Sequence, residues 1–122
     1  MKGQKFWIII AAIMGFLGVA LGAIGGHIVK SFVSPEMLET YKIGINYHFI
    51  HTIVILVIAL SSKEILYKSL PIFLIGIILF SFSLYLYSLT GIRFFAFITP
   101  FGGISFLIGW INIIFLLLKK EK

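Results

Sequence analysis

Cysteine and aspartate are absent from this 122-residue chain, and all four of its glutamates lie outside the long apolar runs. Without cysteine there is no disulfide, thiolate nucleophile or thiolate metal site. Without an acid inside an apolar run, the chain lacks the membrane-embedded glutamate on which small four-helix exporters depend. G-x-S-x-G, G-x-x-x-x-G-K and H-E-x-x-H motifs are also missing. These absences predict a protein that is not an enzyme and holds no cofactor.

Four uncharged apolar runs fill most of the chain, at residues 6–26, 43–62, 69–92 and 94–118. Hydrophobic residues make up 61% of the sequence and charged residues only 11%, against about 25% in soluble domains. Each run has the roughly 20 residues that a helix needs to cross a bilayer. The sequence predicts an all-α integral membrane protein, a single four-transmembrane-helix bundle over residues 1–122. The predicted spans are about 6–26, 43–62, 70–90 and 98–118, with a short amphipathic outer segment at 35–42.

The basic residues give this chain a net charge of +6 and indicate its orientation. They sit at the ends of the apolar runs and form no patch, so nucleic acid is not a predicted partner. With four spans, seven lysines fall on the side of the termini, and Lys30, Lys42 and Arg93 fall on the other. The positive-inside rule then predicts a multi-pass protein of the plasma (inner) membrane with both termini cytoplasmic. A cleaved signal peptide is the alternative at the start, but the 21-residue first run favours a retained anchor.

Local signals predict where the helices begin and end. Ser34-Pro35 and Thr99-Pro100 each combine an N-cap residue with proline at the first helical position. Gly91 is a predicted left-handed cap after the third helix, and Gly25-Gly26 is a predicted cap after the first.

Small residues recur at helical spacing in the first and fourth spans, where they predict close helix packing. The packing positions are Gly15, Gly18, Gly22, Gly25, Gly102 and Gly109. The first-helix stripe serves either packing within the chain, which we favour, or self-association. We expect the two stripes to face each other.

Polar residues within or beside the spans are the candidate site, because polar groups in hydrocarbon need partners. The predicted topology puts six of them at a similar depth on the outer side, where we expect one partly buried ligand-binding or structural cluster: His27, Tyr47, His51, Tyr85, Arg93 and Thr99. His48 and His51 share a helix face, and with His27 they offer either a zinc, copper or haem site or a hydrogen-bonded network. The missing carboxylates favour the network, and no metal is predicted. Arg93 and the amides of residues 101–103 form a candidate site for a lipid phosphate.

Three stretches together resemble a known family: GAIGGHIVKS (22–31), YKIGINYHFIHTIVIL (41–56) and LFSFSLYLYSLTGIRFFAFITPFGGISFLIGW (79–110). They are similar to the YgdD/YwdK family of small four-helix bacterial membrane proteins, a domain-of-unknown-function family. The resemblance implies a four-helix bundle in the plasma membrane with its motif residues toward one side. This chain departs from the family pattern at two positions: His48 stands where that family usually has Gln, and Phe82 stands where a small residue is common. His48 is therefore not expected to be a required ligand, and the last two helices are expected to pair more loosely.

Taken together, these patterns predict a non-enzymatic membrane protein that binds a lipid, a small apolar ligand or a membrane partner through the outer polar cluster. The alternative is a small oligomeric transporter or pore. A homo-oligomer is compatible with either function.

Overall fold

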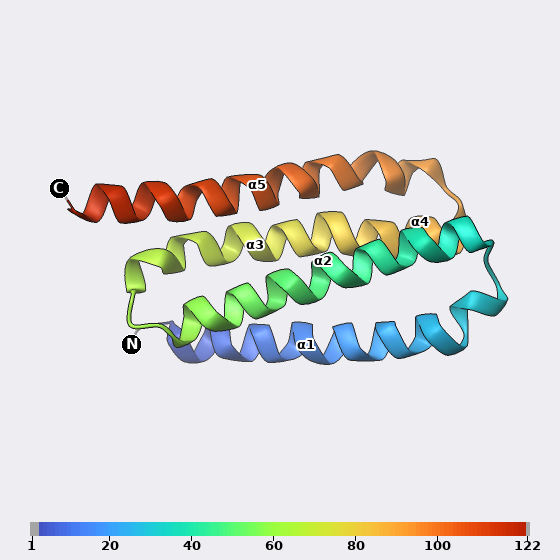
Figure 1. The fold of residues 1–122 in the computed structure, drawn as a ribbon, viewed down its shortest axis with the longest axis horizontal. Coiled ribbons are helices and arrows are strands. Elements are labelled where there is room, and N and C mark those ends of the chain that lie inside the picture. Colours follow the sequence, from blue (N-terminus) through green and yellow to red (C-terminus); the bar gives the residue numbers. More distant parts are fainter. Residues whose placement is uncertain (1–2, 122) are drawn as a thin grey trace.

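Four helical passes lie side by side in a computed structural model that describes residues 3–121 (Figure 1). The first two passes are α1, Gln4–His27, and α2, Pro35–Leu60. The third pass is built from four consecutive pieces: η2 (Glu64–Ser69), α3 (Leu70–Gly76), the π-helical turn η3 (Ile77–Phe82) and α4 (Ser83–Thr90). The last pass is α5, Arg93–Glu121, and a short 3-10 turn, η1 (Val29–Ser31), follows α1. Each pass is long and apolar enough to cross a membrane, which confirms the predicted all-α four-span bundle.

The passes pack in a simple order that fixes which residues can meet. α1 lies against α2, α2 lies against the third pass, and α5 lies against the third pass on its other side. The start of α1 and the end of α5 lie at the same end of the bundle (Figure 1). One apolar core joins all four passes through Ala11, Ile55, Phe73 and Phe106, and a second surrounds Tyr41 and Tyr85.

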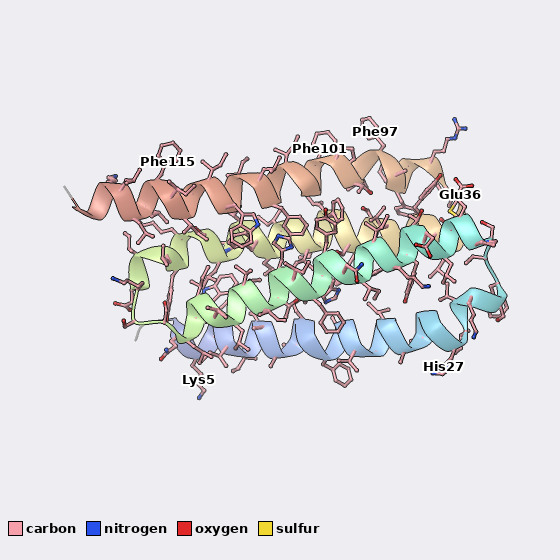
Figure 2. All side chains as sticks on the ribbon, in the orientation of Figure 1. Lys5, His27, Glu36, Phe97, Phe101 and Phe115 are labelled. Atoms are coloured by element: carbon pink, nitrogen blue, oxygen red, sulfur yellow. The ribbon has the colours of Figure 1, made fainter. Side chains whose placement is uncertain are left out.

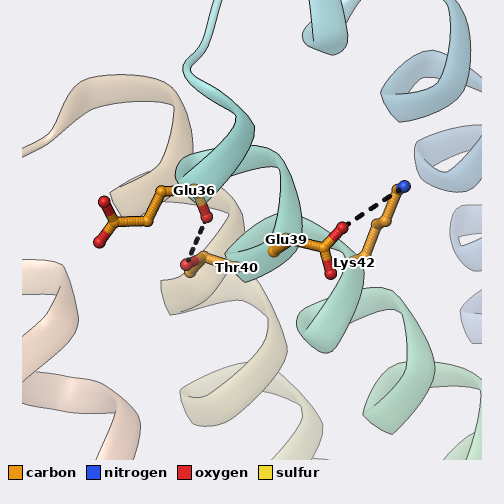
Figure 3. A network of polar contacts seen from close by, with 4 residues as sticks. All are labelled: Glu36, Glu39, Thr40 and Lys42. Carbon is orange, nitrogen blue, oxygen red and sulfur yellow. Dashed lines mark hydrogen bonds and ion pairs between the residues drawn. The ribbon is translucent and has the colours of Figure 1, made fainter.

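α2 begins at the predicted cap, and this single helix makes the second pass longer than the predicted span of 43–62. The Ser34 hydroxyl accepts a hydrogen bond from the Met37 amide at 3.1 Å, and Pro35 takes the first helical position. The predicted amphipathic segment forms the first two turns of this same helix, where Lys42 pairs with Glu39 at 3.7 Å (Figure 3). Because α2 begins about 12 Å before residue 43, His48 and His51 lie near its middle and not in its outer half.

Of the other three predicted helix ends, two are wrong and one is confirmed. Pro100 lies inside α5, which begins at Arg93, so Thr99-Pro100 starts no helix. Thr99 instead donates its hydroxyl to the Phe95 carbonyl at 3.2 Å, a bond within α5. α1 runs through Gly25 and Gly26 to His27. Gly91 does end α4, with a left-handed φ of 70°.

The small-residue stripes face different neighbours. The α1 stripe faces α2: a Cβ on Gly18 would lie 3.0 Å from the Phe49 ring, and Gly25 lies against Tyr41. The α5 stripe faces the third pass, where Gly109 lies against Phe73. The expectation that the two stripes meet is wrong, because α1 and α5 are separated by the middle passes. Both stripes pack within the chain, and the nearest side chains to the remaining α1 positions, Gly15 and Gly22, also belong to α2.

Candidate functional site

His48 is a fully buried side chain that connects three passes. Its Nε2 lies 2.7 Å from the Met14 carbonyl oxygen in α1, and its Nδ1 lies 2.9 Å from the Tyr85 hydroxyl in α4. A carbonyl only accepts, so Nε2 carries the proton, and a neutral ring then accepts the Tyr85 O–H at Nδ1. One side chain thus supplies both a donor and an acceptor in the interior of the bundle.

His51, one helical turn further along α2, connects to the remaining pass. Its Nδ1 lies 2.9 Å from the Tyr47 carbonyl oxygen, and its Nε2 lies 3.1 Å from the Trp110 indole nitrogen in α5. The indole N–H only donates, so Nε2 accepts and Nδ1 carries the proton. The two histidines are therefore opposite tautomers of the neutral imidazole.

The histidine pair links all four passes and uses all of its ring nitrogens in doing so. In hydrocarbon, an unsatisfied polar group costs several kcal/mol, so these contacts favour one relative position of the helices. A metal at this pair would have to displace the Tyr85 or Trp110 contact, because no ring nitrogen keeps a free lone pair. Within residues 3–121, no three histidine or glutamate side chains are grouped to hold a metal ion. The geometry supports the hydrogen-bonded network rather than a metal centre.

An aromatic groove opens beside His51 between α2, η3 and α5. The cavity has a volume of about 460 Å³. The His51 ring stacks on Phe106 with centroids 3.7 Å apart and an interplanar angle of 10°, and Tyr47 packs on Phe80 at 4.6 Å. The lining residues are Tyr47, His51, Phe80, Pro100, Gly103, Ile104, Phe106, Leu107 and Trp110. The groove is mostly apolar, with the polar edges of Tyr47, His51 and Trp110 on its wall.

A second cavity continues along α5 toward the end of the bundle at which Arg93 lies. Its volume is about 650 Å³, and it is lined by Tyr87, Arg93, Ala96, Phe97, Pro100 and Phe101. Pro100 lines both cavities, so they are adjacent on one side of α5. Phe97 and Phe101 point outward from α5 (Figure 2). Among the described residues, Arg93 is paired with no carboxylate.

The structure divides the six predicted site residues among several places. Tyr47 and His51 meet in the aromatic groove, whereas Tyr85 binds His48, and Thr99 lies 2.6 Å from the Ser83 hydroxyl. His27 is exposed and points away from the bundle at the end of α1 (Figure 2), and Arg93 is exposed at the start of α5. The expected convergence on one outer cluster is wrong because residues 35–42 and the second span form one continuous helix, which puts His51 near its middle, whereas His27 and Arg93 lie exposed at the ends of α1 and α5.

Two further expectations change with these helix positions. The amides of residues 101–103 lie within α5 and are not free for an anion, because the helix begins eight residues before Phe101. Phe82 packs on His48 and Tyr85 and lines an apolar cavity of about 390 Å³ with Leu17 and Leu21 of α1. It therefore faces the first two passes rather than the pairing of the last two.

Trp110 and Met14 are site residues that the sequence reasoning did not assign. Trp110 carried a usable signal, since an indole N–H inside an apolar run needs an acceptor and a histidine is the natural one. Met14 carried none, because its contribution is a backbone carbonyl.

Comparison with known proteins agrees with this architecture. The family model described as "Protein of unknown function (DUF423)" matches residues 21–103, which include both histidines and most of the aromatic groove. The chain belongs to this family.

Relatives with UPF0382 names align with this chain over most of their length. The UPF0382 inner membrane protein YgdD of Escherichia coli (strain K12) is 39% identical over 88% of this chain and 85% of its own. The UPF0382 membrane protein YwdK of Bacillus subtilis (strain 168) is 34% identical over 91% and 94%, and a UPF0382 membrane protein of Haemophilus influenzae is 37% identical over 95% and 96%. No solved structure matches. The chain is thus a multi-pass membrane protein of a family whose names give no enzymatic activity.

Proposed function

We propose that this protein binds one lipid-like amphiphile along α5 and acts as a non-catalytic binding protein of the membrane. The apolar chain of the ligand lies in the aromatic groove, and its anionic head lies at Arg93. The observation that carries the proposal is the groove itself, an apolar cavity at membrane depth whose wall has a few fixed polar edges. Most small-molecule sites have this combination of an apolar lining and a small number of placed polar groups.

The floor of the groove is already organised for a ligand. His51 is held by the Tyr47 carbonyl on one side and by Trp110 on the other, so its ring stays stacked on Phe106 without a ligand. A site that is formed in advance loses little conformational entropy when it binds. Flat aromatic faces also suit an isoprenoid or acyl chain, which lies along them by dispersion contacts.

The distance along α5 suits an amphiphile with its head at Arg93. Gly103 is ten residues further along the helix, or about 15 Å, which is half of the ~30 Å hydrocarbon thickness. A lipid whose phosphate meets Arg93 and Tyr87 therefore extends its chain to the start of the aromatic groove. The unpaired guanidinium offers a positive partner that a phosphate group fits.

We propose further that Arg93 faces the outside of the cell. In the sequence, seven lysines flank the start of α1, the turn between α2 and α3 and the end of α5, helix ends that share one end of the bundle, whereas three basic residues flank the helix ends at the Arg93 end. This difference supports cytoplasmic termini by the positive-inside rule. The proposed ligand then belongs to the outer leaflet.

Filling the groove tests the proposed function. A Cβ on Gly103 would lie 3.8 Å from the Phe80 ring, an ordinary contact, so Gly103→Leu should fold and occupy the cavity. We expect native mass spectrometry of the delipidated protein, titrated with phosphatidylglycerol, to show lipid bound to the natural protein and much less bound to Gly103→Leu.

Gly26→Leu is the matched control, because a Cβ on Gly26 meets nothing within 4 Å and the residue lies far from the groove on α1. Arg93→Gln tests the proposed contact between Arg93 and the lipid headgroup. It should lower the affinity for phosphatidylglycerol by about fivefold and leave the affinity for phosphatidylcholine with the same chains unchanged. Equal lipid binding by Gly103→Leu and Gly26→Leu would refute the proposal.

A further inference from the structure

The outward face of α2 has a pattern that the proposed lipid site does not use. Six exposed residues follow one another at alternating steps of three and four: Ile43, Asn46, Ile50, Ile53, Val57 and Leu60. This is the spacing of the seam that one helix presents to another in a coiled coil. The opposite side of α2 packs against the third pass through Gly44, His48 and Ile55. The exposed seam therefore has no partner within the described chain.

Asn46 distinguishes this face from an ordinary lipid-facing surface. It lies about 6 Å along α2 from the exposed Lys42, inside the apolar run that begins at residue 43. Its side chain makes no hydrogen bond with any part of residues 3–121. Other outward-facing side chains at mid-depth in the four passes are apolar or aromatic. An amide in lipid is costly, and asparagine is too short to reach the headgroups.

We infer that α2 pairs with α2 of a second copy of this chain, with the two Asn46 amides hydrogen-bonded across the dimer axis. The asparagine side chain contains both a donor and an acceptor, so two copies related by a two-fold axis satisfy each other. Hydrogen bonds of this kind drive association of membrane helices, and a single asparagine in an apolar seam also fixes the register of the pair.

The dimer face leaves the proposed lipid groove open. Tyr47 and His51, the two α2 residues that line the groove, lie toward α5, where His51 binds Trp110. Ile50 and Ile53 lie on the exposed side of the same turns, with 52% and 57% of their surfaces accessible. The inference does not depend on the proposed function, since one concerns the exposed face of α2 and the other the cavities along α5.

Disulfide cross-linking in the native membrane tests the dimer, and the absence of natural cysteine makes each variant a clean probe. Ile53→Cys is placed on the seam. Ile111→Cys on α5 is the matched control, with a similar exposed fraction of 51%. Under mild oxidation we expect a covalent dimer from Ile53→Cys at low expression, and little from Ile111→Cys.

Asn46→Leu is then added to the Ile53→Cys background. Losing the hydrogen bonds between the amides should weaken dimerisation, measured by fluorescence energy transfer between labelled copies in liposomes, by about tenfold in dissociation constant. Asn46→Gln, which keeps a donor and an acceptor, should retain the dimer. Equal cross-linking at positions 53 and 111, or an unchanged dissociation constant in Asn46→Leu, would overturn the inference.

Discussion

His48 is hydrogen-bonded to two other passes, α1 and the third pass. The wholly buried ring donates to the Met14 carbonyl and accepts from the Tyr85 hydroxyl. Its structural role is to combine a donor and an acceptor on one rigid group. Neither contact requires a charge or a titrating proton. A side chain with the same two functions can therefore replace it.

His48→Gln should keep the protein close to its natural stability, because the amide NH₂ can donate to Met14 and the amide oxygen can accept from Tyr85. His48→Leu leaves the Tyr85 hydroxyl without its acceptor and should lower the free energy of unfolding by about 1–3 kcal/mol. Thermal unfolding in one detergent compares the two variants. A leucine variant as stable as the glutamine variant would show that the contact contributes nothing.

Gly102 of α5 lies directly against the backbone of the third pass. A Cβ there would lie 2.7 Å from the Leu79 carbonyl carbon and closer still to the Phe80 backbone, and backbone cannot move aside as a side chain can. Gly102→Ala should therefore destabilise the protein by about 2 kcal/mol or more. Gly103→Ala, whose Cβ has ordinary contacts, is the adjacent control in the same unfolding measurement. Similar unfolding temperatures for the two variants would mean that the passes are not packed this closely.

At the scale of the elements, the irregular third pass and the tight turns set the depth of the side chains. The π-helical turn η3 lies where Gly102 of α5 approaches the Leu79 and Phe80 backbone, so the change in winding and the close contact occur together. The turn between α4 and α5 contains only Gly91 and Ile92. So short a turn holds Arg93 and Tyr87 together at one cavity.

Gly91→Ala should destabilise the turn by about 1 kcal/mol, because Gly91 has a φ of 70° that L-residues with a Cβ adopt only at a cost. Nothing lies within 4 Å of the added Cβ, so the loss is purely conformational. Gly91→Asn should lose less, since asparagine tolerates the left-handed region better than alanine. Chemical unfolding of both variants measures the difference, and the reverse order would contradict the conformational explanation.

The helix ends show which features of the fold the sequence predicts and which it does not. Ser34-Pro35 and Thr99-Pro100 look alike as dipeptides, yet only the first begins a helix. The difference lies in their place in the fold: Ser34 follows the short connection after α1, whereas residues 94–98 before Thr99 already belong to α5. Four spans and the Gly91 cap were therefore predictable. The depth of His51 was not, because it depends on residues 35–42 and the second span forming one continuous helix.

At the scale of the whole molecule, charged residues and packed residues determine different features of the structure. The lysines at one end bear on orientation across the membrane, whereas the glycine stripes and the histidine pair determine how the passes sit beside one another. Pairings such as His51 with Trp110, 59 residues apart, follow from the packing order of four helices. One sequence without its structure does not give that order.

Impermeant maleimide labelling of intact cells tests the proposed orientation. Glu36→Cys lies in the first turn of α2 at the Arg93 end, and Ser62→Cys lies in the turn at the other end; both positions are exposed. We expect Glu36→Cys to react in intact cells and Ser62→Cys to react only after permeabilisation. The opposite pattern would place the termini outside.

The aromatic groove as a ligand site is the central claim, and the two tryptophans of the chain allow a direct measurement. Trp110 lines the groove and donates its indole N–H to His51, whereas Trp7 lies half-buried on α1 beside Phe6. In an NMR titration of the delipidated, ¹⁵N-labelled protein with phosphatidylglycerol, we expect the Trp110 indole resonance to shift in a saturable manner and the Trp7 resonance to stay in place. An unmoved Trp110 resonance, or equal shifts of both, would contradict binding in the groove.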